Sequence, residues 1–514
     1  MANSKIERVR GVNDVLPREY RAMRHIQDTL QATFERFGYA PLELPVIEHT
    51  DLYLKKSGEE IIARMYDFQY RSRRLCLRPE MTASVMRAYI DNLQNEPLPL
   101  RLHYSGPVFR YEKPQKARYR QFTQMGVELI GASQALADAE VIRLAYGALQ
   151  ALGLKDFRAV IGHVGILSRF LQNLKIDSRL RSFLLQNMEA MQKKGSAFVT
   201  ERLRQIYPAF EDSSAQTMPR SQRLTALFQE MDEAEARLAV LDFLQNINIH
   251  LEGSRDADEI IARLLTKIRR RDQTPGLQSA LRFMDEISRL SGSPAAVLPE
   301  AEKILASYAI DRSALDALRE LVRALEHYGL GWEHISLDLG LSRGLQYYTG
   351  TIFEVHHGGL GEERQLCGGG RYDDLIATLG GLNDIPATGF AFGLERLHLA
   401  LESEGGAKGG PQPLVRALIA AIDAQDFPYA VETAERLRAH GVPVELDVRQ
   451  RSVKSNLQYA DKRGIAFVVL IGPTERAAGE VVLRAMDTRQ EKRVRAEEVY
   501  AAMQQMRGEN DGQS

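Results

Sequence analysis

Basic and aromatic side chains alternate over residues 106–131, GPVFRYEKPQKARYRQFTQMGVELIG. Two stretches typical of strands, VFRYE and RYRQFTQMGVELIG, flank a Lys-Pro-Gln-Lys-Ala turn, so we predict a β-hairpin with a charged tip. Guanidinium groups bind phosphate oxygens in pairs, and aromatic rings stack on flat bases. The side chains of the hairpin are therefore suited to binding a polyphosphate that carries a base. The alternative is a solvated hairpin whose charges protect the edge of the sheet. Its basic and aromatic members are Arg110, Lys113, Lys116, Arg118, Arg120, Tyr111, Tyr119 and Phe122.

Three other segments combine specific polar side chains with glycine or proline. In LCLRPEMTASVMR (75–87), Glu80 precedes Thr82 near the predicted start of a helix, where a carboxylate also simply complements the helix dipole. In SRGLQYYTGTIFE (342–354), bulky polar residues and two glycines indicate either the wall of a polar pocket or a tight bend of a sheet. In ATGFAFGLERLHLAL (387–401), a strand passes into a helix that carries Arg396, and an ordinary amphipathic helix explains this segment equally well.

Composition limits the class of protein. The 514 residues are enough for about three or four domains, and 44% hydrophobic and 26% charged residues are ordinary for a globular chain. With 67 Lys and Arg against 68 Asp and Glu, a polyanionic partner would have to be met by local basic patches. Cys76 and Cys367 provide neither a disulfide framework nor a metal cluster. No run approaches the roughly 20 apolar residues of a membrane helix, and MANSKIERVRGVNDVLP lacks the apolar core of a secretory signal. We therefore expect a cytoplasmic protein without a membrane partner.

Changes in sequence texture divide the chain into parts. Residues 1–165 mix helical and strand patterns, with Met23, Ile26, Leu30 and Phe34 on one helical stripe that ends near Gly38. Residues 166–328 contain amphipathic helical pieces and are predicted to form a helical insertion. Residues 329–401 return to strand-rich sequence, and ESEGGAKGGPQP (402–413) is the predicted linker. Residues 414–508 are predicted to follow the order strand, helix, strand, helix, strand, strand, helix in a compact α/β domain with a mostly parallel sheet, and 509–514 are a tail.

Six ordered segments together resemble the histidyl-tRNA synthetase family of class II aminoacyl-tRNA synthetases. RVRGVNDVLP lies near the start, GYAPLELPVIEHTDLY resembles motif 1, FRYEKPQKARYRQF motif 2 and GFAFGLERL motif 3. The two histidine-specific segments of the family occur as SRGLQYYTGTIFE and LCGGGRYDDLI. The resemblance covers residues 5–165 and 330–495, while the insertion matches only in position. It implies an α+β fold with a largely antiparallel six-stranded catalytic sheet flanked by helices, a helical insertion and a C-terminal α/β anticodon-binding domain.

The resemblance also implies an activity and a set of site residues. The chain would activate L-histidine with ATP to histidyl-adenylate and transfer it to the 3′ end of tRNA(His). The catalytic cations would be Arg343 and Arg110, which stabilise charge as the histidine carboxylate attacks ATP. Magnesium (Mg2+) would bridge the triphosphate oxygens, without a metal cluster of the protein. The implied ATP-binding residues are Arg110, Glu112, Arg118 and Arg396, and the implied histidine-binding residues are Glu80, Thr82, Gln124, Glu128, Arg343, Tyr347, Tyr348 and Tyr372.

Contacts with tRNA are expected at two places. By resemblance, Lys113 and Gln115 at the hairpin tip would meet the acceptor end, and Arg451 and Lys454 would belong to the basic face of the C-terminal domain. A homodimer is expected, because motif 1 of this class builds a subunit interface around Pro45.

Two positions depart from the family pattern, and they bear on an alternative function. Gln346 stands where the family usually has Asp, and Thr123 where it usually has His. The histidine-binding regulatory subunit of ATP phosphoribosyltransferase resembles the same core but does not aminoacylate tRNA. RQFTQMGVELIGA and Gln346 favour this alternative weakly, whereas the set of four arginines and the C-terminal domain favour the synthetase.

Overall fold

The protein is described here by a computed structural model. It describes residues 6–55, 62–113, 119–174, 176–207, 235, 238–239, 273–342, 347–405 and 416–511, without the side chains of 362–363 and 508–511. The chain forms two compact units, residues 1–406 and 407–514. The boundary between them lies within the predicted linker, 402–413, and the finer domain boundaries stay predictions.

The first unit is built on one large sheet. Its strand order is β1-β5-β6-β12-β11-β10-β7-β9-β8. Within the run β5-β6-β12-β11-β10-β7, every pair of neighbouring strands is antiparallel. This run confirms the predicted six-stranded antiparallel sheet, to which short strands are added at both edges. The bounds are β1 (Ala40–Pro41), β5 (Leu100–Phe109), β6 (Gln121–Ile130), β7 (Phe157–His163), β8 (Ser291–Gly292), β9 (Ile335–Asp338), β10 (Thr351–His357), β11 (Gln365–Arg371) and β12 (Ala387–Gly393).

Strands β5 and β6 confirm the predicted hairpin, but β5 extends further from its tip than expected. Their register runs from Leu100 opposite Ile130 to Phe109 opposite Gln121. The predicted arms placed Arg110 and Arg120 inside strands, whereas both lie beyond the ends of the ladder. Arg110 and Arg120 remain joined by one backbone hydrogen bond of 2.8 Å, so the two chains leave the sheet together.

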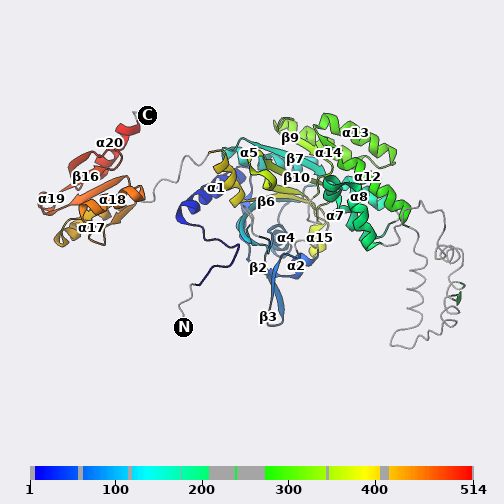
Figure 1. Ribbon diagram of the computed structural model, residues 1–514, viewed down its shortest axis with the longest axis horizontal. Helices are drawn as coiled ribbons and strands as arrows, with labels where there is room; N and C mark the ends of the chain where they lie inside the picture. The colour runs from blue at the N-terminus through cyan, green and yellow to red at the C-terminus, as the bar shows by residue number, and fades with distance from the viewer. Residues whose placement is uncertain are drawn as a thin grey trace. The chain divides into compact units, whose positions relative to one another are not determined.

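Helices α1 (Pro17–Arg36), α5 (Ala135–Ala151) and α16 (Leu394–Ser403) pack with the large sheet (Figure 1). Helix α1 buries the four residues of its predicted stripe, which pack into the main hydrophobic core. It ends at Phe37, where Gly38 takes a φ of 80° that glycine adopts without steric cost. The stripe of apolar residues therefore fixes which face of α1 meets the sheet.

The helical insertion packs against one end of the sheet and shares its core. Figure 1 shows its helices beside β7 and β9. Within the insertion, Asn187 separates two helices, and the second is interrupted at Gly195. The insertion helices among the described residues are α6 (Val164–Asn173), α7 (Ser178–Gln186), α8 (Met188–Ile206), α12 (Thr274–Ser288), α13 (Pro294–Ser307) and α14 (Ser313–His327).

A small sheet and several short helices lie beside β5. The sheet order is β2-β4-β3, with antiparallel pairing throughout. Arg78, which follows β4, donates to the backbone oxygens of Leu44 and Pro45 at 2.7 and 3.0 Å and so ties the small sheet to motif 1. The elements are β2 (Ile47–His49), β3 (Tyr66–Tyr70), β4 (Arg73–Leu77), α2 (Asp51–Leu54), α4 (Thr82–Ala88), η1 (Tyr89–Leu93) and α15 (Leu375–Leu379). The short helix η2 (Gly358–Glu363) packs on α16 instead.

The second unit has a five-stranded sheet of order β14-β13-β15-β16-β17. Strand β13 is parallel to β14 and β15, but β16 and β17 are antiparallel, so the predicted mostly parallel sheet is only half correct. Strand β17 and helix α19 were not among the predicted elements. The elements are β13 (Ala417–Ala421), η4 (Ala424–Asp426), α17 (Phe427–Ala439), β14 (Val444–Leu446), α18 (Val453–Arg463), β15 (Phe467–Ile471), α19 (Pro473–Ala478), β16 (Glu480–Ala485), β17 (Glu491–Arg495) and α20 (Val499–Asp511).

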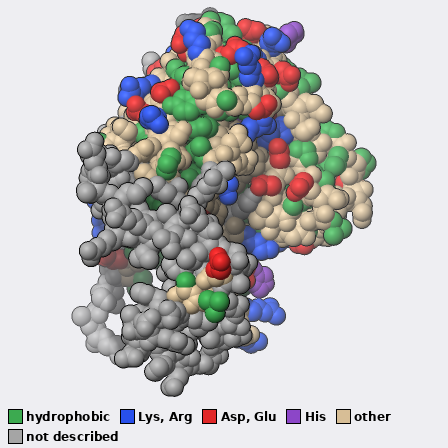
Figure 2. Space-filling model, turned by 90° about the vertical axis from the view of Figure 1, so that its right-hand side faces the viewer, with side chains coloured by type: hydrophobic (Ala, Val, Ile, Leu, Met, Phe, Trp, Pro, Cys, Tyr) green, Lys and Arg blue, Asp and Glu red, His purple; other side chains and the backbone are tan. Residues whose placement is uncertain are grey.

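Charged side chains of both signs are interspersed over the face shown in Figure 2. Such mixing agrees with the formal net charge of −1. An anionic ligand would therefore be attracted by particular arginines and lysines rather than by the whole surface.

Candidate active site

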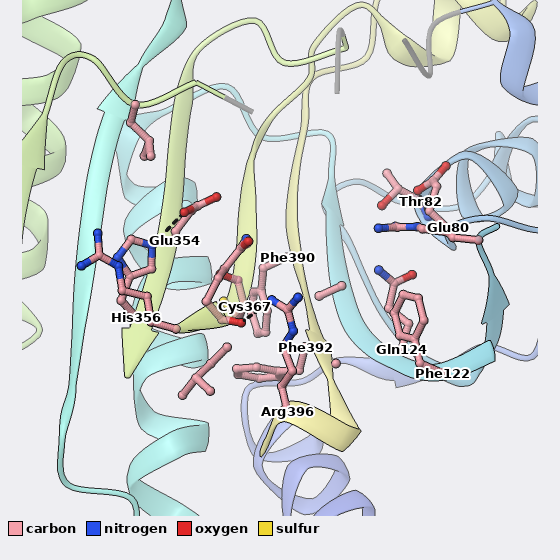
Figure 3. Close-up of a pocket in the computed structure, with 18 of the residues that line it drawn as sticks. Glu80, Thr82, Phe122, Gln124, Glu354, His356, Cys367, Phe390, Phe392 and Arg396 are labelled. Carbon is pink, nitrogen blue, oxygen red and sulfur yellow. Dashed lines mark hydrogen bonds and ion pairs between the residues drawn. The ribbon is translucent and has the colours of Figure 1, made fainter. Parts of the chain in front are cut away.

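A cavity of about 1200 Å³ opens over the large sheet, between β6, β10, β11 and β12, the first turn of α16 and the start of α4 (Figure 3). Segments far apart in the sequence converge on it. Of the predicted site residues, nine line this cavity: Glu80, Thr82, Arg110, Glu112, Gln124, Tyr347, Tyr348, Tyr372 and Arg396. The other predicted residues are placed below, and Arg118, Arg343 and Gln115, together with Gln346, lie outside the described residues.

Glu80 lies at the start of α4 and is almost completely buried, with 2% of its surface exposed. Its carboxylate accepts hydrogen bonds from the backbone N–H groups of Thr82 (2.8 Å) and Ala83 (3.0 Å). Burial raises the pKa of Glu80, while these N–H groups and the charge of Arg110 act in the opposite direction. The helix start thus holds a carboxylate at the cavity edge next to a guanidinium.

Glu128 lies directly behind the cavity lining on β6. Its carboxylate accepts hydrogen bonds from three hydroxyl groups, those of Thr82 at 2.8 Å, Tyr104 at 3.1 Å and Tyr372. Burial raises the pKa of Glu128 well above its ordinary value, and the nearby charge of Glu80 adds to this shift. Glu128 therefore orders Thr82 and Tyr372, two side chains that form the cavity wall.

Strand β12 comes so close to Glu128 that only glycine fits at position 389. A Cβ on Gly389 would collide with the Glu128 carboxylate and with the backbone oxygen of Val127. At Gly126 on β6, a Cβ would collide with the backbone oxygen of Phe390. The floor of the cavity at Gly389 is consequently bare backbone rather than side chain.

Three tyrosines form an aromatic wall. The ring centres of Tyr347 lie 4.8 Å from Tyr348 and 5.5 Å from Tyr372, and those of Tyr348 and Tyr372 are 6.2 Å apart. Tyr347 and Tyr372 are buried, whereas Tyr348 is half-buried. Such a wall can accept a flat ring by edge or face contact.

Two arginines reach the same cavity from different elements. Arg110 donates from Nε to the backbone oxygen of Pro79 at 2.8 Å, and its guanidinium lies 5.4 Å from the ring centre of Phe122. Arg396 extends from α16 toward Cys367 (Figure 3) and donates to the backbone oxygen of Gln365 at 2.9 Å. Each guanidinium is held in place by a backbone carbonyl, as required for a preorganised phosphate contact.

The charged hairpin tip is only partly described. Glu112 pairs with Arg64 at 3.2 Å at the cavity edge. Lys113 is exposed and does not line the cavity. In the second unit, Arg451 pairs with the buried Asp447 at 2.7 Å and lies 4.4 Å from the Tyr459 ring centre, while Lys454 is exposed on α18.

Several cavity residues were missed by sequence reasoning. Glu395 accepts a hydrogen bond from the backbone N–H of Thr123 at 2.8 Å, and burial raises the pKa of Glu395. Strand β12 ends at Gly393, opposite Gln124, so the Glu395 side chain supplies the next acceptor along β6. Its position next to Arg396 in GFAFGLERL was the available signal.

Strand β10 contributes a second missed group. His356 and Glu354 are joined by a 2.8 Å contact and line the cavity, whereas the neighbouring His357 is buried against Glu404 at 3.0 Å. Adjacent side chains on a strand point to opposite faces, so His356 faces the cavity and His357 faces away from it. Nothing in the local sequence indicated which face of β10 forms the cavity.

The antiparallel six-stranded sheet, its cavity and the second α/β unit define the fold of a class II aminoacyl-tRNA synthetase. The histidyl-tRNA synthetase of S. aureus has this fold with a TM-score of 0.61 at 24% identity, covering 97% of this chain and 99% of that chain. A Bacillus halodurans protein described as an ATP phosphoribosyltransferase regulatory subunit/histidyl-tRNA synthetase gives a TM-score of 0.63 at 23% identity, covering 91% and 98%.

Sequence comparison narrows the class to one family. The family model described as histidyl-tRNA synthetase matches residues 11–274 and 254–397, and an anticodon binding domain model matches residues 416–506. A histidine–tRNA ligase of Archaeoglobus fulgidus is 33% identical over 97% of this chain and 100% of its own length. One of Methanocaldococcus jannaschii is 31% identical over 96% and 98%. The chain belongs to the histidyl-tRNA synthetase family.

Two further observations bear on partners. Among the described residues, no helix has the length and apolar character needed to cross a membrane. The described part of the chain also contains no group of three or more His, Cys, Asp or Glu side chains arranged to hold a metal ion.

Proposed function

We propose that the protein is a histidine–tRNA ligase, which forms histidyl-adenylate from L-histidine and ATP and transfers the histidyl group to the 3′ end of tRNA(His). The observation that carries the proposal is the cavity itself. It brings together the buried carboxylate of Glu80, an aromatic wall and the guanidiniums of Arg110 and Arg396, with Arg110 beside Glu80. Relatives matched over nearly their whole length, including the second unit, are histidine–tRNA ligases, which disfavours the regulatory-subunit alternative.

The first step needs positive charge around the triphosphate. A carboxylate oxygen of histidine attacks the α-phosphorus of ATP, a new P–O bond forms, and the bond to the bridging oxygen breaks to release pyrophosphate. We assign Arg110 and Arg343 to the α-phosphate and Arg118 and Arg396 to the γ-phosphate. No proton has to move in this step, so fixed cations are the main requirement. ATP is expected to bind as its magnesium complex, in which Mg2+ offsets the negative charge of the phosphates.

Histidine carries two groups that a carboxylate can recognise, its α-ammonium and an imidazole N–H. Because the reacting carboxylate must lie beside Arg110, the ammonium attached to the same Cα falls near Glu80, whose pKa responds to the charge of Arg110. The imidazole then extends toward Tyr348 and the Glu128 cluster behind Thr82 and Tyr372. Gln124 accepts from the backbone N–H of Met81 at 3.1 Å and thus fixes the space between these two ends.

Transfer to tRNA requires contacts outside the cavity. We assign Lys113 and Gln115 to the acceptor end and Arg451 and Lys454 to the tRNA backbone, where cations contribute binding energy independent of sequence. Glu112 is assigned to the adenine end of ATP. We also propose a homodimer. Support comes from the small sheet that Arg78 ties to Pro45, where Ile47, Phe68 and Tyr70 are exposed.

Histidine-dependent ATP–pyrophosphate exchange, followed by charging of tRNA(His), tests the proposal. A ligase exchanges label only when histidine is present and then yields histidyl-tRNA. A regulatory subunit would bind histidine without exchange and would raise the activity of a separate phosphoribosyltransferase. Absence of exchange with saturating histidine, ATP and magnesium would refute the proposed activity.

A further inference from the structure

Helix α8 of the helical insertion reaches the substrate cavity. Glu189, Gln192 and Lys193 line the cavity. Asp338 at the end of β9, with Leu341 and Ser342 just after it, lines the cavity beside them. The sequence assigned Glu189, Gln192 and Lys193 to the insertion (166–328) and Asp338 to the strand-rich segment 329–401. The cavity thus has one wall that belongs to the insertion.

Gln192 makes the specific connection between the two parts. Its Nε2 donates to both carboxylate oxygens of Asp338, at 2.8 and 3.0 Å, and reaches the backbone oxygen of Ser288 at 3.4 Å. All of these partners are acceptors, so a side chain that donates is required at position 192. A glutamate of the same size would place an ionised carboxylate against Asp338.

Asp338, held by Gln192, in turn fixes the backbone of the turn that follows β9. Its carboxylate accepts from the backbone N–H of Gly340 at 2.9 Å, and its backbone oxygen accepts from Leu341 at 3.2 Å. Gly340 packs so closely that a Cβ there would lie 2.7 Å from Gln192 Nε2 and 2.8 Å from the Ser288 oxygen. The turn therefore has one position relative to the insertion, and it places Leu341 and Ser342 in the cavity wall.

We propose that Gln192 is a positioning residue for amino-acid activation, so that the helical insertion takes part in the first chemical step. It acts by fixing Asp338 and the turn that carries Leu341 and Ser342. The inference rests on the proposed function, because Ser342 directly precedes Arg343 in the sequence and Arg343 is assigned to the α-phosphate. Gln192 itself is exposed, so its replacement removes the contact with Asp338 without opening a buried cavity.

The experiment measures histidine-dependent ATP–pyrophosphate exchange in the full-length protein for Gln192→Ala and Gln192→Glu. One hydrogen-bonded contact to a charged group predicts that kcat falls roughly 3- to 10-fold for Gln192→Ala, with KM for ATP unchanged. Gln192→Glu is expected to be more impaired, because it adds repulsion. The matched controls are Gln205→Ala and Gln205→Glu, since Gln205 is exposed on the same helix and does not line the cavity.

A double variant separates positioning from folding. In Gln192→Glu with Asp338→Asn, the Asn amide donates to the new carboxylate while its oxygen still accepts from Gly340, so kcat should recover relative to Gln192→Glu alone. Unchanged exchange in both Gln192 variants would overturn the inference. So would a loss of activity that follows a lowered melting temperature and disappears at lower temperature. If the unaltered protein shows no histidine-dependent exchange, the proposed function fails rather than this inference.

Discussion

Removal of the Arg110 guanidinium is the sharpest test of the proposed chemistry. Arg110 is fixed by a 2.8 Å hydrogen bond to Pro79 and lines the cavity, so it is preorganised for the charge that develops on the α-phosphate. A fixed donor of this kind contributes about 3 kcal/mol to the transition state, which corresponds to about 150-fold in kcat for Arg110→Ala. Arg110→Lys keeps the charge but loses the planar fork, so an intermediate loss is expected.

The same change has a second consequence that can be measured through pH. Burial raises the pKa of Glu80, and the positive charge of Arg110 lowers it. Without that charge the pKa of Glu80 rises further, and the carboxyl group is protonated at a higher pH. If ionised Glu80 binds the histidine ammonium, the acidic limb of the kcat/KM profile for histidine should move to higher pH in Arg110→Ala.

Histidine-dependent ATP–pyrophosphate exchange over a pH series measures both effects. Arg101→Ala provides a control on β5, the strand that leads to Arg110, because Arg101 binds Glu140 at 2.8 and 2.9 Å and does not line the cavity. Its exchange rate should stay within about twofold of the unaltered protein, since a partly exposed ion pair contributes little. Exchange by Arg110→Ala within about threefold of the unaltered protein would refute the role given to this arginine.

Three further changes test other parts of the site. Gly389→Ala should lower stability by about 1–3 kcal/mol through the collision with Glu128, seen as a lower melting temperature, and should raise KM for histidine more than KM for ATP. Glu395→Ala removes the acceptor of the Thr123 N–H and should raise KM for ATP about tenfold in exchange, whereas Glu395→Gln, which keeps an acceptor, should change it less than about threefold. Lys454→Ala should weaken charging of tRNA and its salt dependence while exchange without tRNA stays normal; equal loss in both assays would contradict a tRNA role.

Apolar periodicity and helix-capping residues correctly predicted those elements whose stabilising interactions lie between residues close in the sequence. The apolar stripe of α1 is buried as expected, and the helix that starts at Thr82 has Glu80 at its N-terminus. The strand-to-helix passage at Gly393 also places Arg396 in the first turn of α16. In each case the deciding interactions lie within a few residues of one another, so periodicity and capping carry the information.

Contacts between segments far apart in the sequence produce no periodicity or capping signal, so they could not be predicted. Gln192 and Asp338 are 146 positions apart, and no periodicity in either segment indicates that they meet. The face of β10 that carries His356 could be deduced only once its neighbours in the sheet were known. Strand β17 was missed because its exposed, charged sequence EKRVR has the appearance of a loop, although pairing with β16 stabilises it as an edge strand.

The bare cavity floor at Gly389, with Gly126 on the strand beside it, has a consequence for inhibitors of this protein. When an inhibitor gains affinity from contacts with side chains, a single substitution at a contacted residue can weaken its binding. Neither glycine can acquire even a methyl group without colliding with a backbone oxygen of the neighbouring strand. Compounds that lie flat on this stretch of main chain would therefore meet a surface on which resistance mutations have little room to arise.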